Sequence, residues 1–107
     1  MGSDTRLERV DPEALRAHAG QASGLLKTLA NEQRLSICCL LLDHEQTVAE
    51  LNERLDLSQS ALSQHLAVLR EAGVVHSDRD GQRRRYRLDP GPVVAVIRAL
   101  HASYCTD

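Results

Sequence analysis

Three cysteines are the side chains best suited to chemistry in this 107-residue chain, and they fall at two places. Cys38 and Cys39 are adjacent within an apolar stretch, whereas Cys105 lies four residues after His101. On a helix that spacing puts Cys105 one turn from His101, where an imidazole favours a thiolate. An odd number of thiols in a cytoplasmic protein leaves thiols available for redox or metal chemistry. The simpler interpretation of each is a small core residue of low reactivity.

A second set of functional candidates is polar and uncharged. Residues 57–73 read LSQSALSQHLAVLREAG, and a helix turning about 100° per residue gives this stretch two unlike sides. The apolar side carries Ala61, Leu62, Leu66, Leu69 and Ala72, and the other carries Gln59, Ser60, Ser63, Gln64, Ala67 and Arg70. Ser and Gln both donate and accept hydrogen bonds, which suits base edges in a DNA major groove. The alternative is an ordinary amphipathic surface helix.

The distribution of charge favours the DNA-binding interpretation more than the net charge of −2 does. Residues 1–53 carry five basic and nine acidic side chains, whereas residues 54–87 carry seven basic and four acidic ones. Five of these seven basic residues fall within nine positions: Arg79, Arg83, Arg84, Arg85 and Arg87. The positive charge therefore gathers in and directly after the polar helix.

The elements that must position these residues are predicted from caps, spacing and turn residues. We expect helices from Asp11 to about residue 30, from Asn31 to Asp43, from Thr47 through residue 55, and from Ser58 to Gly73. Strands are expected over 74–77 and 83–88, with a turn at 79–81, and a last helix follows residues 90–92. Leu15, Leu25, Leu26 and Leu29 are expected on the inner side of the first helix. Two helices joined by a short connector and followed by a basic hairpin form a winged helix-turn-helix.

Length and composition predict one domain. Residues 1–10 are expected to be a disordered tail, and residues 11–105 a single DNA-binding and dimerisation domain. The chain has no Trp and no Phe, so the core must be aliphatic, and small aliphatic helical domains often complete their burial by dimerising. No secretion signal or membrane span is evident, which predicts a cytoplasmic protein. No catalytic constellation, nucleotide-binding loop or Cys-x-x-Cys is present, so we expect neither an enzyme nor a cofactor.

The sequence resembles the ArsR-type bacterial transcriptional regulators. The resemblance is carried by LANEQRL at 29–35, by residues 58–73 and by the hairpin from Asp80 to Tyr86, and it covers roughly residues 24–105. It implies a mainly α fold with a small β-hairpin wing, in the order of four helices, two strands and a last helix. It also implies a homodimer through the first and last helices, with two recognition helices entering successive major grooves of an imperfect palindrome.

Mapped onto this chain, the resemblance places base-reading positions on the polar side of residues 57–73. These positions are Gln59, Ser60, Ser63 and Gln64. His65 lies at the edge of that side, and we favour a packing role for it over a base contact. In the wing, alternation along a strand separates Arg83 and Arg85 from Tyr86 and Leu88. We expect the two arginines to contact phosphates or the minor groove, with mere solvation as the alternative, and Tyr86 and Leu88 to pack inward.

The same resemblance bears on what the protein senses. Metal-sensing members carry Cys-x-Cys in the helix before the recognition helix, or a set of Asp, His and Glu ligands in the last helices. In this chain residues 47–51 hold no cysteine, and Asp89 and His101 are present without the remaining ligands. The thiols instead resemble the persulfide-sensing branch, the HlyU, BigR and SqrR type. RLSICCLLL at 34–42 and LHASYC at 100–105 carry this likeness. It implies a redox pair of Cys39 and Cys105, with a reactive sulfur species or an oxidant as inducer.

Three hypotheses follow. The first is a repressor that binds DNA when reduced and releases it when a disulfide or polysulfide joins Cys39 to Cys105. The second is a repressor sensing arsenite or another soft metal through its cysteine thiolates, which ranks lower because adjacent cysteines seldom serve one metal together. The third is a thiol enzyme or a protein-interaction module, which no motif supports. The sequence leaves the operator and the role of Cys38 open.

Overall fold

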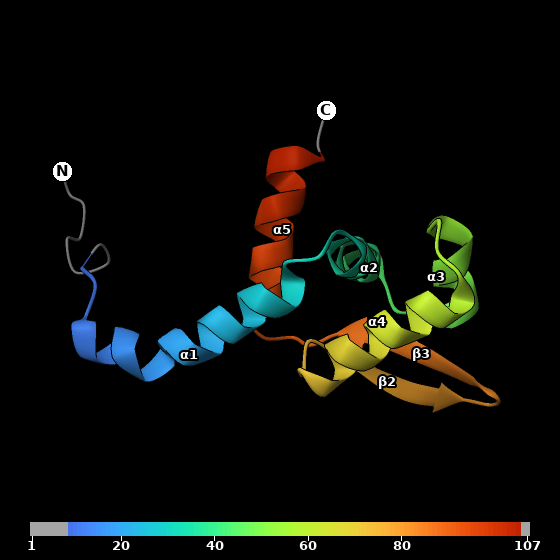
Figure 1. Ribbon diagram of the computed structural model, residues 1–107, viewed down its shortest axis with the longest axis horizontal. Helices are drawn as coiled ribbons and strands as arrows, with labels where there is room; N and C mark the ends of the chain where they lie inside the picture. Colours follow the sequence, from blue (N-terminus) through green and yellow to red (C-terminus); the bar gives the residue numbers. More distant parts are fainter. Residues whose placement is uncertain (1–8, 106–107) are drawn as a thin grey trace.

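The computed structural model describes residues 9–105, and Figure 1 shows the order of its elements along the chain. The predicted tail over 1–10 lies outside the described residues except for Arg9 and Val10, which are exposed. Within the described part the chain forms α1 (Pro12–Leu29), α2 (Glu32–Asp43), β1 (Gln46–Thr47), α3 (Val48–Arg54), α4 (Gln59–Glu71), β2 (Val75–Asp80), β3 (Arg83–Leu88) and α5 (Pro92–Tyr104). The mainly α fold with a β-hairpin wing is confirmed.

Helix α1 begins where the sequence predicts but packs differently. The Asp11 carboxylate accepts a hydrogen bond from the Glu13 N–H, and Pro12 occupies the first turn. Only Leu29 at the other end is fully buried. Leu15 and Leu26, predicted to face inward, are each 57% exposed because no other element within residues 9–105 covers them. In Figure 1, α1 extends well beyond the rest of the molecule.

Helix α2 lies at the centre of the domain, as its apolar composition predicts. The Asn31 side chain accepts hydrogen bonds from the Gln33 and Arg34 N–H groups and so fixes the start of the helix. Ile37 and Leu41 are buried in the aliphatic core. The core is completed by Leu29, Cys38, Leu51, Leu62, Leu66, Leu69, Val74, Val75, Tyr86, Val93 and Ile97. Helix α2 thereby contacts α1, α4, α5 and β3.

Helices α3 and α4 form the helix-turn-helix. A capping box starts α3: Thr47 accepts from the Glu50 N–H, and the Glu50 carboxylate accepts from the Thr47 N–H. Ser58 caps α4 by accepting from the Ala61 N–H. Ala72, predicted on the apolar side, is exposed because α4 ends there, and Gly73 follows with φ of 75°. Each of these signals is local, so the pair of helices was predictable.

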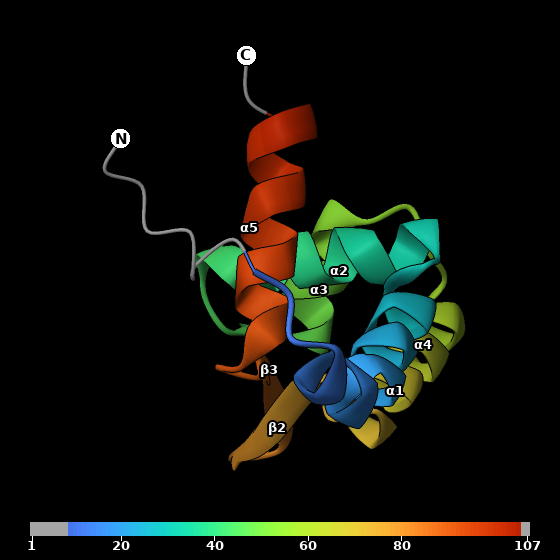
Figure 2. The same ribbon diagram turned by 90° about the vertical axis from the view of Figure 1, so that its left-hand side faces the viewer.

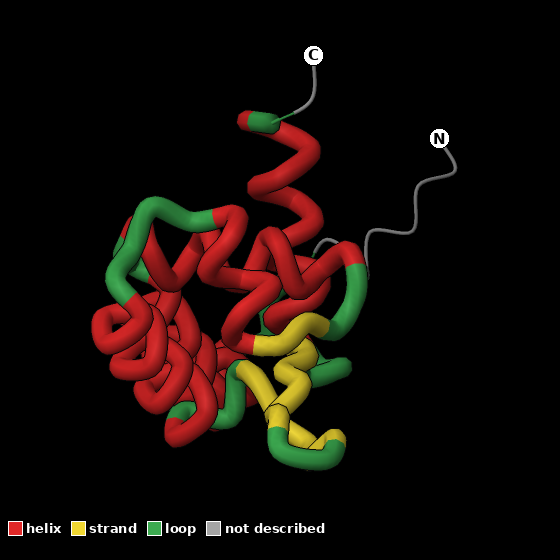
Figure 3. The backbone as a smooth tube through the Cα atoms, turned by 90° about the vertical axis from the view of Figure 1, so that its right-hand side faces the viewer, coloured by secondary structure: helices red, strands yellow, loops and turns green. Residues whose placement is uncertain are grey.

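The sheet differs from the prediction in two respects. Its strand order is β1-β3-β2, so a short third strand that the sequence did not reveal pairs Gln46 with Tyr86 and Thr47 with Arg85. The first strand of the wing also runs to Asp80 rather than ending near residue 77, and pairs there with Arg83. The turn therefore lies at Gly81, whose φ of 66° suits glycine. Figure 3 shows the hairpin protruding beside the helices.

Candidate DNA-binding surface and thiol pair

The outer side of α4 presents the predicted base-reading residues together. Gln59, Ser60, Ser63 and Gln64 are all exposed. Leu62, Leu66 and Leu69, on the opposite side, are buried against the rest of the domain. His65 is partly buried at the border of the two sides, which is compatible with the packing role expected for it. The geometry therefore offers a row of short donors and acceptors on a helix whose other side is fixed by the core.

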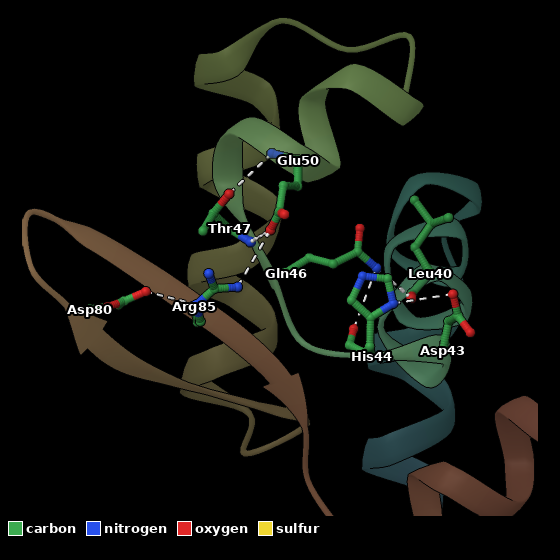
Figure 4. A network of polar contacts seen from close by, with 8 residues as sticks. All are labelled: Leu40, Asp43, His44, Gln46, Thr47, Glu50, Asp80 and Arg85. Atoms are coloured by element: carbon green, nitrogen blue, oxygen red, sulfur yellow. Dashed lines mark hydrogen bonds and ion pairs between the residues drawn. The ribbon is translucent and has the colours of Figure 1, made fainter.

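The connector between α3 and α4 is held by a side-chain contact. The Asn52 amide donates to the Leu57 carbonyl at 2.9 Å, which spans the turn of the helix-turn-helix. The loop between α2 and α3 is held in a similar way: the amide of the buried Gln46 side chain donates to the Leu40 carbonyl at 2.7 Å. Figure 4 shows Gln46 reaching back toward the end of α2. These contacts fix the position of α3, and with it the approach to α4.

The arginines of the wing divide into bound and unbound side chains. Arg83 is exposed, and its side chain has no hydrogen bond or ion pair with another residue of the described range. The Nε of Arg85 lies 2.9 Å from the Asp80 carboxylate, and its Nη1 lies 3.7 Å from the Glu50 carboxylate. Figure 4 shows Arg85 between the wing and the start of α3. The two predicted phosphate ligands are thus present on the wing, but only Arg83 is free.

Glu50 has a second partner besides Arg85. Hydrogen bonding by Thr47 within the capping box is the main cause that lowers the pKa of Glu50, and the nearby positive charge of Arg85 contributes. The carboxylate is therefore charged at neutral pH and links α3 to β3. On the other side of β3, Tyr86 is buried and Leu88 packs against the core, as predicted. Alternation along β3 accordingly separates the charged side of the wing from its core side.

The three thiols occupy three different environments. Cys38 is fully buried, and this burial raises its pKa to about 12. Cys39 is partly buried, and desolvation raises its pKa, with a further rise caused by the charge of Cys105. Cys105 is exposed at the end of α5, where its backbone N–H donates to the His101 carbonyl at 2.9 Å. Helices α2 and α5, which carry Cys39 and precede Cys105, pack against each other.

An interaction that the sequence did not predict joins the wing to the loop that precedes α5. The His76 Nε2 and the Asp89 Oδ1 are 2.6 Å apart, and the other Asp89 oxygen accepts from the Gly91 N–H. Hydrogen bonding to His76 lowers the pKa of Asp89. Asp89 lies before α5 rather than within it, and it is engaged with His76 instead of His101. In residues 9–105 no three or more His, Cys, Asp or Glu side chains are grouped to hold a metal ion.

A polar outer side on the second helix of a helix-turn-helix, flanked by a basic hairpin, defines a winged helix-turn-helix DNA-binding protein. Residues 31–77 match the family described as "Bacterial regulatory protein, arsR family". The chain belongs to this ArsR family of transcriptional regulators, as its relatives also indicate. It is 48% identical over 93 residues to the transcriptional activator HlyU of Vibrio cholerae, covering 87% of this chain and 86% of that one. It is 42% identical to the biofilm growth-associated repressor of Agrobacterium fabrum, covering 98% and 95%.

Solved structures give the same result. Reduced HlyU from Vibrio cholerae superimposes with a TM-score of 0.83 at 48% identity, covering 88% of this chain and 99% of that one. The transcriptional repressor BigR from Xylella fastidiosa gives 0.82 at 34% identity, covering 92% and 100%. The homodimeric winged helix-turn-helix domain of Mb0332 from Mycobacterium bovis gives 0.72 at 25% identity, covering 89% and 88%. Within residues 9–105, no helix has the length and apolar character needed to span a membrane.

Proposed function

We propose that this chain is a homodimeric, sequence-specific DNA-binding repressor of the cytoplasm whose affinity for its operator falls when Cys39 and Cys105 become linked. Gln59, Ser60, Ser63 and Gln64 read base edges, because they form the exposed polar side of α4. Arg83 and Arg85 contribute phosphate or minor-groove contacts from the wing. The operator is an imperfect palindrome, since a symmetric dimer presents the same helix to each half-site.

The exposed apolar side of α1 supports the dimer. An isolated helix of 18 residues that contains Gly20 and Gly24 is marginally stable in water, so α1 needs packing that this chain alone does not supply. A cavity of about 830 Å³ between α1 and α5 adds to the unfilled surface, and its apolar lining includes Leu25, Leu26 and Val96. A second copy that covers α1 and α5 supplies the packing that α1 lacks and fills the cavity. The homodimeric state named for Mb0332 is consistent with this assignment.

The packing of α2, which carries Cys39, against α5, which ends next to Cys105, supports the regulatory part of the proposal. The charge of Cys105 is felt at Cys39, although the two lie on different helices. Cys105 is exposed and so meets the inducer first, whereas Cys39 is shielded and acts second. Cys38 is excluded from the pair by its burial. One of the structural relatives is named as reduced HlyU, a name that specifies the redox state of that protein.

In the proposed reaction that links the two cysteines, the oxidant is a low-molecular-weight persulfide. The Cys105 thiolate attacks the outer sulfur of the persulfide, forms an S–S bond, and releases the small thiol as its thiolate. The Cys39 thiolate then attacks the inner sulfur of the Cys105 persulfide and expels hydrosulfide. Both protein thiols are oxidised and the persulfide is reduced. If a second persulfide molecule first transfers its outer sulfur to Cys39 and releases its own thiolate, the Cys39 persulfide attacks the inner sulfur of the Cys105 persulfide, expels hydrosulfide, and leaves one additional sulfur in a polysulfide bridge.

The link acts on DNA binding through the scaffold. Cys39 belongs to the central helix, while Cys105 ends α5, whose carboxyl-terminal half extends away from the body of the domain in Figure 2. A covalent bond between them fixes α5 relative to α2, which also packs against α4. Since α5 is a proposed dimer element, the bond changes the spacing of the two α4 helices. A mismatch with the half-site spacing lowers operator affinity.

Electrophoretic mobility shift assays test the proposal on operator DNA selected from random duplexes by the reduced protein. We expect the reduced protein to shift the DNA and persulfide treatment to abolish the shift. Cys39→Ser and Cys105→Ser are each expected to bind DNA and to ignore persulfide. Cys38→Ser serves as the matched control and is expected to respond like the wild type.

Intact-mass spectrometry of the same samples identifies the bridge. A disulfide lowers the mass by two hydrogens, whereas each retained sulfur atom raises it by a fixed increment. If either Cys39→Ser or Cys105→Ser still releases DNA on treatment, the pair mechanism is wrong. Stoichiometric arsenite binding to the reduced protein, with loss of the DNA shift, would instead support the soft-metal hypothesis.

A further inference from the structure

A small polar pocket lies between the recognition helix and the wing. Its volume is about 340 Å³, and it is lined by Ser63, Ala67, Arg70, Glu71 and Tyr86. Ser63, Ala67 and Arg70 are spaced by four and three residues, so they share one side of α4, and Tyr86 faces them from β3. None of the base-reading assignments except Ser63 involves this pocket.

The Arg70 and Tyr86 side chains at the pocket have no hydrogen-bond partner among the described residues. The Arg70 side chain makes no hydrogen bond or ion pair with another residue of the described chain, in contrast to Arg84, Arg85 and Arg87 of the wing. The Tyr86 ring is buried, yet its hydroxyl has no partner among residues 9–105. Since no buried side-chain nitrogen or oxygen there lacks a partner, this hydroxyl reaches solvent at the pocket.

We propose that this pocket binds a phosphodiester group of the DNA backbone, with Arg70 as its principal ligand and the Tyr86 hydroxyl as an additional donor. The inference rests on the proposed DNA-binding function. A guanidinium fork and a hydroxyl supply charge-assisted hydrogen bonds of the kind that phosphate oxygens accept. Glu71 is the one acidic side chain of the lining, and its charge opposes the ligand.

The position of the pocket favours a backbone phosphate over a base. When α4 lies in a major groove and the wing contacts the adjacent minor groove, the strand that separates the grooves passes between the two elements. The pocket occupies this space, because α4 supplies four of its residues and β3 supplies Tyr86. A phosphate held there fixes the register of α4 along the duplex without reading sequence.

The test is the salt dependence of binding to two labelled duplexes of unrelated, arbitrary sequence, measured by fluorescence anisotropy from about 50 to about 200 mM salt. For Arg70→Gln we expect the slope of log K against log salt to fall by about 0.9 for each chain bound. The affinity should fall about tenfold or more for each chain, and by the same factor on both duplexes. Arg70→Lys should retain the slope because it keeps the charge.

Two further variants separate a phosphate ligand from a general effect of charge. Glu71→Gln should strengthen binding, since it removes the opposing charge, and Tyr86→Phe should weaken it about threefold while keeping the buried ring. Arg16→Gln on the outer part of α1 is the matched control and should leave the slope unchanged.

The possible results are distinguishable. If the wild type binds neither duplex at low salt, the proposed DNA-binding function fails, and the pocket assignment fails with it. If the wild type binds and Arg70→Gln behaves like Arg16→Gln, the pocket assignment alone is wrong. A loss confined to one of the two sequences would mean that Arg70 contacts a base, which also overturns the phosphate assignment.

Discussion

Cys38 and Cys39 are adjacent in sequence, yet the fold gives them different chemistry. The helical turn of about 100° between neighbouring residues directs the Cys38 side chain into the core and leaves Cys39 partly exposed. The sequence pattern distinguished the two only through a family resemblance, because an apolar helix with little amphipathic character does not reveal which side is innermost. Burial supplies the physical reason for assigning Cys38 to packing.

The raised pKa of Cys38 predicts a pH dependence of stability. In the folded protein this thiol stays protonated up to about pH 12, whereas in the unfolded chain it ionises near its ordinary value of 9.0. Unfolding therefore becomes more favourable as the pH rises between these values, by up to about 1.4 kcal/mol per pH unit. We expect Cys38→Ala to lower the unfolding free energy by about 1 kcal/mol at pH 7. Above pH 9 the unfolding free energy of this variant should decrease less steeply with pH than that of the wild type.

Denaturant unfolding at several pH values measures this difference. Ile37→Val is the matched core control, because it also removes a buried group but has no proton to lose; its deficit relative to the wild type should be the same at every pH. A constant difference between the wild type and Cys38→Ala across the alkaline range would contradict the assignment of Cys38 as a buried protonated thiol.

At the scale of elements, helix starts were predictable and contacts between elements were not. Asp11, Asn31, Thr47 and Ser58 each cap a helix through bonds that span two or three residues, so the local sequence contains the whole signal. The pairing of β1 with β3 joins segments far apart in the chain, and nothing in the two residues of β1 indicates it. The partners of Arg85 escaped prediction for the same reason.

Arg83 and Arg85 of the wing differ in their ion-pair partners, and this difference predicts unequal contributions to DNA binding. Arg83 is free, whereas the charge of Arg85 is already compensated by Asp80 and Glu50. We expect Arg83→Gln to lower both the affinity for DNA and the salt slope more than Arg85→Gln does. Asp80→Asn should strengthen DNA binding, because it releases Arg85 and removes a negative charge from the wing. The measurement is a fluorescence anisotropy titration at several salt concentrations.

The double variant Asp80→Asn with Arg85→Gln is the control for that release. In the wild type, Asp80→Asn should raise the affinity for DNA both by removing a negative charge and by freeing Arg85. In the Arg85→Gln background the same substitution should raise the affinity by less, because Arg85 is no longer there to be freed. Equal losses for Arg83→Gln and Arg85→Gln would mean that DNA displaces the carboxylates from Arg85 without penalty, and the distinction between the two side chains would then fail.

At the scale of the whole molecule, one copy of the chain leaves several large apolar side chains of α1 and α5 exposed. The sequence placed Leu15 and Leu26 on an inner surface, and the fold of one copy leaves both exposed, together with Tyr104 near the end of α5. A periodic pattern indicates that a side chain becomes buried but does not indicate which chain covers it. The exposed leucines are therefore better explained by a partner than by an error in the helix assignment. A second copy of the chain that covers the apolar side of α1 would also account for the symmetric DNA site proposed above.

Leu26→Asp tests this interpretation, because a carboxylate placed in an apolar interface opposes association strongly. In sedimentation equilibrium we expect the wild type to have the mass of two chains and Leu26→Asp that of one. Operator affinity should fall sharply in the variant, since two half-sites must then be bound by separate chains. Val68→Asp, which changes an exposed apolar residue of α4 instead, should keep the mass of two chains, and Leu26→Met should keep both the mass and the affinity. A Leu26→Asp protein that still sediments as two chains would place the dimer contact elsewhere. The proposed effect of the Cys39–Cys105 link on half-site spacing would then depend on α5 as the dimer contact without α1.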